Sequence, residues 1–123
     1  MTLVTSYFDI RAGASSTSIS IDVTTPAPDR VRVLVSGEVD LASAPRLDEA
    51  VTRVLDEHRP AGVELDLSGV GLLDSTGVRS LLLAHAAAEA AGCRLVVTNA
   101  QPRVHRVLAI TAVLERLGLA PDT

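Results

Sequence analysis

The chain has 123 residues, of which 47% are hydrophobic and 2% aromatic, and its formal net charge is -4. This length supports one domain with its own core. The acidic balance repels nucleic-acid phosphates, and the few aromatics offer no stacking platforms for single strands, so nucleic acid is excluded as an expected partner.

Three features favour a cytoplasmic protein. Cys93 is the only cysteine, so no intrachain disulfide is possible. The N-terminal stretch lacks the basic start and apolar run of a secretory signal peptide. Charged residues, among them Arg79, Glu89 and Arg94, interrupt the most apolar stretch at 78–97, which makes it a poor membrane span. We therefore expect a cytoplasmic chain that does not enter a membrane.

The first half of the chain predicts a hairpin followed by a helix. Apolar and polar residues alternate along 19–24 and again along 31–36, the period of strands with one buried face. A turn at 26–29 joins them, so we expect an antiparallel hairpin. Residues 37–42 are then predicted as a loop, and Ser43 as the cap of a helix whose apolar stripe faces the core.

The second half alternates strands and helices. The expected elements are strands at 63–67 and 94–98, a loop at 68–73, and helices at 75–91, from Pro102 onward and at 113–117. Gly92 is well placed to end the first of these helices.

This order, β-β-α-β-α-β-α-α, predicts an α/β fold with a four- to five-stranded mixed sheet. Because the strands alternate instead of being apolar throughout, we expect the helices mainly on one face. The folded domain spans 19–119, preceded by an N-terminal arm at 1–18 and followed by a tail at 120–123.

Two loops, at 37–40 and 73–77, follow parallel strands at one sheet edge, where such folds form their functional sites. Asp74 is a good N-cap, which makes Ser75 the first helical residue. A helix start favours negative charge, so it tolerates a phosphate on Ser75. That phosphate would add about -1.5 to -2 charges near Asp74. Asp-Ser-Thr-Gly also suits a helix start with no modification, and both readings remain open on these residues alone.

The segment from Val63 to Gly77, VELDLSGVGLLDSTG, closely resembles the signature of STAS-domain proteins, the bacterial anti-sigma factor antagonists. In that family an apolar strand leads into Asp-Ser-Ser/Thr-Gly and a leucine-rich helix. Gly-Glu-Val-Asp at 37–40 resembles the family's earlier Gly-Glu-Leu/Val-Asp loop, and residues 93–108 resemble its later strand and helix. The resemblance covers about Ile19 to Leu117.

The resemblance implies a STAS fold and a binding protein that is not an enzyme. In the family, the unphosphorylated antagonist binds an anti-sigma factor, usually also a serine kinase, and so frees the sigma factor. Phosphorylation of the serine at the position of Ser75 separates the complex, and a phosphatase resets it. Thr76 is a second hydroxyl beside Ser75. The implied flanking residues are Asp74, Thr76 and Gly77, and the implied partner-binding residues are Asp40, Ser75, Thr76, Val78 and Arg79.

One departure from the family is Ala112, which stands where members usually have glycine and predicts a different turn before the last helix. The same fold also builds stress-signalling scaffolds and accessory subunits of lipid-transport complexes, which is the alternative function. A free antagonist is expected to be a monomer or a weak dimer.

Catalytic and metal chemistry have little support. The three histidines are far apart and have no ligand-spaced neighbours, so no metal or other cofactor is expected. No histidine is evidently paired with Ser75 as a base, and Cys93 is predicted to be a small buried hydrophobe.

Overall fold

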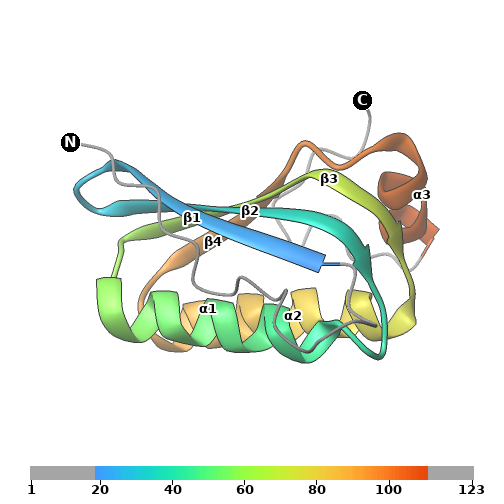
Figure 1. Ribbon diagram of the computed structural model, residues 1–123. Helices are drawn as coiled ribbons and strands as arrows, with labels where there is room; N and C mark the ends of the chain where they lie inside the picture. Colours follow the sequence, from blue (N-terminus) through green and yellow to red (C-terminus); the bar gives the residue numbers. More distant parts are fainter. Residues whose placement is uncertain (1–18, 111–123) are drawn as a thin grey trace.

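The computed structural model describes residues 19–110, which form a four-stranded sheet with three helices (Figure 1). The elements are β1 (Ile19–Ala27), β2 (Arg30–Val39), α1 (Ala44–His58), β3 (Gly62–Leu73), α2 (Ser75–Ala90), β4 (Arg94–Thr98) and α3 (Pro102–Ile110). The strands lie in the order β1-β2-β3-β4; β1 pairs antiparallel with β2, and the other pairs are parallel. The predicted mixed α/β sheet and its order are confirmed. The arm at 1–18, Ala112, the helix at 113–117 and the tail at 120–123 lie outside the described residues.

Helices α1 and α2 pack side by side against one face of the sheet, while α3 packs against β3 near one end (Figure 1). The inward-facing residues of the strands are fully buried, as Val33 and Leu65 illustrate with 0% exposure. Helices α1 and α2 thus confirm the prediction that the helices lie mainly on one face.

Cys93 is also buried, which raises the pKa of its thiol. No helix within residues 19–110 is long and apolar enough to span a membrane.

Strands β1, β2 and β3 are longer than predicted. β1 continues to Ala27, so the turn is confined to residues 28–29. The predicted loops at 37–42 and 68–73 are wrong in part. β2 continues to Val39 and β3 continues to Leu73, so these residues belong to the strands. The two strands stay paired across register irregularities, and this pairing supplies hydrogen bonds that overcome the weak strand propensity of the glycines.

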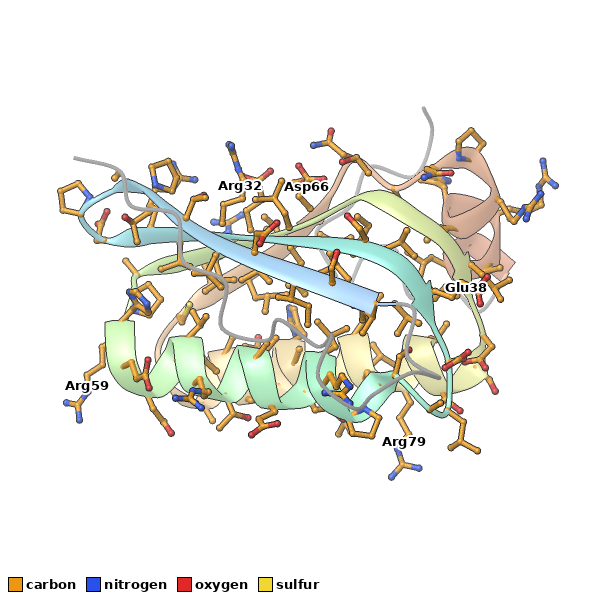
Figure 2. All side chains as sticks on the ribbon, in the orientation of Figure 1. Arg32, Glu38, Arg59, Asp66 and Arg79 are labelled. Carbon is orange, nitrogen blue, oxygen red and sulfur yellow. The ribbon has the colours of Figure 1, made fainter. Side chains whose placement is uncertain are left out.

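The sheet face opposite α1 and α2 carries polar contacts between strands. Nε of Arg32 in β2 donates to the Glu64 carboxylate in β3 at 3.1 Å, and the Thr98 hydroxyl in β4 donates to the same carboxylate at 2.6 Å. Figure 2 shows Arg32 and Asp66 on this face, directed away from the helices. Such cross-strand pairs stabilise the face that α1 and α2 leave uncovered.

Asp66 is the most buried acidic group of this face, with 8% exposure. Its two oxygens accept hydrogen bonds from the Ser68 backbone N–H at 2.8 Å and from the Asn99 side-chain amide at 3.0 Å. Burial raises the pKa of the Asp66 carboxyl, but these hydrogen bonds and the charge of Arg32 outweigh burial and hold the pKa below its usual range. Asp66 therefore links β3 to the turn before α3 in its ionised form.

We expect Asp66→Asn to lower the free energy of unfolding by about 1 kcal/mol near neutral pH. Because the pKa of Asp66 is lower in the folded state, its contribution is present above the ordinary aspartate pKa of about 3.9 and is lost as the pH falls through the folded value. Urea unfolding of both proteins between neutral and acidic pH measures this difference. A difference that stays constant with pH contradicts the prediction.

Candidate functional site

The loop between β2 and α1 is held by its own side chains. Oδ1 of Asp40 accepts the backbone N–H groups of Ala42 and Ser43, both at 3.0 Å. The Ser43 hydroxyl, in a residue only 1% exposed, donates to the Glu38 carbonyl at 2.7 Å and accepts the Asp40 N–H at 3.0 Å. Ser43 is the N-cap residue of α1, as predicted, but its side chain makes no cap hydrogen bond and closes the preceding loop instead.

Helix α2 begins with a cap of the expected kind. Asp74 has an extended backbone, and its Oδ1 accepts the Gly77 backbone N–H at 3.0 Å. Asp74 is thus confirmed as the N-cap and Ser75 as the first helical residue. Ser75 is exposed and Thr76 is half-buried, so the Ser75 hydroxyl is the more accessible of the two at the positive end of the helix.

The two loops lie together at one edge of the sheet. Val39 pairs with Leu73 at the ends of β2 and β3, and the Asp74 backbone N–H donates to the Val39 carbonyl at 3.3 Å. Gly77 makes this approach possible, because a Cβ atom there would lie 2.9 Å from the Val39 carbonyl oxygen. The expected proximity of the two loops is confirmed.

The other predicted site residues differ in their exposure to solvent. Arg79 is exposed and points away from the sheet in Figure 2. Asp40 is half-buried and has one oxygen committed to its own loop. Val78 is only 6% exposed and packs into the core, so it lies beneath the surface around Ser75.

Two exposed apolar side chains at this edge were missed by sequence reasoning. Leu41, in the loop after β2, is 76% exposed, and Leu72, near the end of β3, is 40% exposed. A leucine inside a predicted polar loop is the signal that marks Leu41 in the sequence. Leu72 carries no comparable signal, because an apolar residue in a strand is ordinary.

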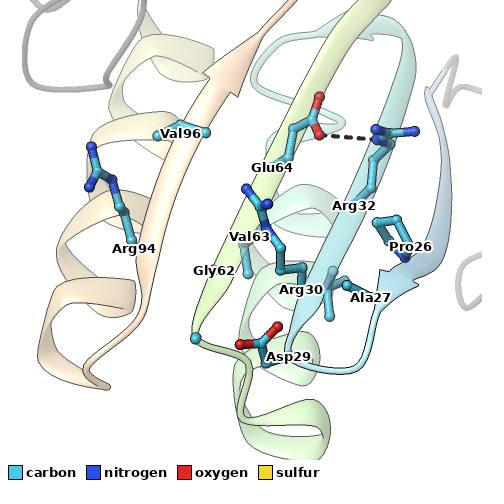
Figure 3. Close-up of a pocket in the computed structure, with 12 residues that line it drawn as sticks. Pro26, Ala27, Asp29, Arg30, Arg32, Gly62, Val63, Glu64, Arg94 and Val96 are labelled. Carbon is cyan, nitrogen blue, oxygen red and sulfur yellow. Dashed lines mark hydrogen bonds and ion pairs between the residues drawn. The ribbon is translucent and has the colours of Figure 1, made fainter.

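A hollow of about 470 Å³ lies at the other end of the sheet, where β2, β3 and β4 begin (Figure 3). Arg30, Arg32 and Arg94 line it, and Arg32 is paired with Glu64. This hollow is remote from Ser75, and residues 19–110 contain no group of three potential metal ligands.

A family profile described as "Mlab, STAS domain" matches residues 23–119. The chain belongs to the STAS domain family. This membership agrees with the sheet order and with the Asp-Ser-Thr-Gly start of α2.

The relatives include antagonists of anti-sigma factors. An anti-sigma-B factor antagonist of Listeria monocytogenes is 28% identical over 96 residues, which cover 78% of this chain and 83% of that protein. An anti-sigma factor antagonist from Mycobacterium paratuberculosis has a TM-score of 0.70 and 28% identity, with 85% of this chain and 87% of that chain covered. The unphosphorylated anti-sigma factor antagonist SpoIIAA shares the fold, with a TM-score of 0.68 at 17% identity and coverage of 78% and 84%. The predicted STAS fold is thus confirmed.

We expect Gly77→Ala to destabilise the protein by about 1–3 kcal/mol, because the added methyl group overpacks the contact with Val39. The direction of this change in stability is informative, because a glycine-to-alanine substitution inside a helix usually stabilises a protein by about 1 kcal/mol. Urea unfolding measures the effect. Gly71→Ala is the control, because no atom beyond the two neighbouring residues in the chain lies within 4 Å of the added methyl group. A Gly77→Ala protein as stable as the wild type contradicts the packing argument.

Proposed function

We propose that this STAS-domain protein is an anti-sigma factor antagonist controlled by phosphorylation of Ser75. The observation that carries the proposal is the exposed Ser75 hydroxyl at the first position of α2, directly after the Asp74 cap. It stands in a chain that is 28% identical to an anti-sigma-B factor antagonist over 78% of its length. In its unphosphorylated form the chain binds an anti-sigma factor and thereby releases a sigma factor in the cytoplasm.

The partner is proposed to be a serine kinase as well as an anti-sigma factor. The kinase transfers the γ-phosphoryl group of ATP to Oγ of Ser75, releasing ADP and the hydroxyl proton. A separate phosphatase hydrolyses the phosphoserine and restores the binding form. This protein itself supplies no catalytic residue and needs no cofactor, and the free chain is a monomer or a weak dimer.

Ser75 is a better phosphoacceptor than Thr76 for two reasons. It is exposed, whereas Thr76 is half-buried. The Ser75 hydroxyl also takes no part in capping α2, because the Asp74 side chain accepts the hydrogen bond from the Gly77 N–H. A phosphate at the first helical position is favoured by the helix dipole, so the domain can carry it without unfolding.

The phosphate weakens partner binding through charge. Ser75 adjoins Asp74, and the Asp40 loop lies at the same sheet edge as the start of α2. A phosphate adds about two negative charges to this acidic edge. A like-charge contact in an interface costs several kcal/mol, which is enough to separate a complex. Asp40, Thr76 and Arg79 complete the proposed contact surface around Ser75, and Val78 supports it from the core.

The first expected outcome concerns the modification itself. Intact-mass and phosphopeptide mass spectrometry of the protein isolated from its own cells should find a phosphate on Ser75 in part of the population. The Ser75→Ala protein should carry none. If the wild type has no phosphate during growth or stress, the switch is refuted, and a constitutive scaffold role becomes the better explanation.

The second expected outcome concerns the complex. Ser75→Asp should weaken binding to the anti-sigma factor purified from the same cells by about tenfold or more, while Ser75→Ala should keep wild-type affinity. Ala61→Asp is the matched control, because it adds the same charge at an exposed position before β3, at the other end of the sheet. Titration calorimetry measures the three affinities. Equal binding by Ser75→Asp and the wild type refutes the charge mechanism.

A further inference from the structure

Leu41 is the most exposed large apolar side chain within residues 19–110. Its exposed fraction is 76%, compared with 51% for Leu83 and 40% for Leu72. Single exposed leucines are common on protein surfaces, so exposure alone does not mark a binding residue. The loop that carries Leu41 provides the further argument.

The backbone on both sides of Leu41 is held in place. Asp40 accepts the N–H groups of Ala42 and Ser43 through its side chain, and its own N–H donates to the Ser43 hydroxyl. The Ala44 N–H donates to the Asp40 carbonyl at 2.8 Å. Every one of these polar groups is satisfied within the loop, while the Leu41 side chain faces solvent. A side chain on such a preorganised loop loses little backbone entropy on binding.

The position of this loop connects Leu41 with Ser75. Leu41 follows Val39 by two residues, and the Val39 carbonyl accepts the Asp74 N–H at 3.3 Å. Two residues of extended chain span at most about 7 Å. A protein that covers Leu41 therefore also reaches the start of α2. Leu83 lies about 12 Å further along α2 than Ser75, from the rise of 1.5 Å per helical residue.

The charges near Leu41 define the chemistry of the partner. Glu38, Asp40 and Asp74 place three carboxylates at this edge, and Glu38 is exposed. A complementary surface has an apolar depression for the leucine and basic side chains at its rim.

We propose that Leu41 is the apolar anchor by which the anti-sigma kinase docks and brings its active site to Ser75. This inference rests on the proposed function and adds a contact residue to it. The leucine side chain enters an apolar depression of the kinase, and the carboxylates around it meet basic residues. Ser75 then lies close enough to accept the phosphoryl group.

The test compares the phosphorylated fraction of Ser75 in the full-length wild type, Leu41→Ser and Leu83→Ser proteins. Each is produced in its own cells in place of the wild-type copy and analysed by intact-mass and phosphopeptide mass spectrometry. Leu41→Ser should lower the phosphorylated fraction about tenfold, the affinity loss expected when an interface loses a buried leucine side chain. Leu83→Ser is the matched control, because it makes the same substitution at an exposed position of α2. It should leave the phosphorylated fraction of Ser75 unchanged. Urea unfolding should show that both variants remain folded, because neither leucine belongs to the buried core.

The outcomes separate this inference from the proposed function. If the Leu41→Ser protein has the same phosphorylated fraction as the wild type, Leu41 is not the docking residue. The proposed phosphorylation switch at Ser75 is unaffected by that result. An equal fall in Leu41→Ser and Leu83→Ser also overturns the docking role of Leu41, because the effect is then not specific to this loop. The absence of phosphate from the wild type refutes the proposed function, and the anchor falls with it.

Discussion

The parallel pairing of β2 with β3 is the constraint on which the rest of the structure depends. The register runs from Arg30 opposite Gly62 to Val39 opposite Leu73 and absorbs two irregularities on the way. Because the last residues of β2 and β3, Val39 and Leu73, are paired with each other, the two loops that follow these strands begin side by side. The hydrogen bond from Asp74 to Val39 then ties the start of α2 to the loop before α1. The placement of Ser75 is a consequence of this pairing.

The two faces of the sheet are stabilised in different ways. The face towards α1 and α2 is held by burial of aliphatic side chains, which is non-directional and tolerant of small adjustments. The opposite face depends on the hydrogen bonds of Glu64 and Asp66, which link β2, β3, β4 and the turn into α3. Gln101 adds a bond from this turn to the Ser68 carbonyl at 2.7 Å. These directional contacts fix the position of α3 against the end of β3.

The edge that carries Ser75 divides its residues between inward and outward roles. Ser43, Gly77 and Val78 are buried and hold the two loops in place. Leu41 and Ser75 are exposed. Since Ser75 contributes no capping bond to α2, a charge placed on it alters the surface while the cap formed by Asp74 is preserved. Under the proposed function, phosphorylation of Ser75 changes this surface while the buried residues that hold the two loops stay in place.

The sequence by itself determined the order of the elements and the start of α2. The alternation of apolar and polar residues in the strands and the apolar stripe of the helix indicate which face of each element is buried. The cap of α2 is also local, because Asp74 and Gly77 are only three residues apart. The family resemblance of residues 63–77 added the expected role of Ser75. Only the tertiary structure decided that β2 and β3 continue through their glycines, that Val78 is buried and that Leu41 is held outward. Each of these depends on neighbours far away in the chain, because strand pairing and burial are set by contacts that local sequence does not encode.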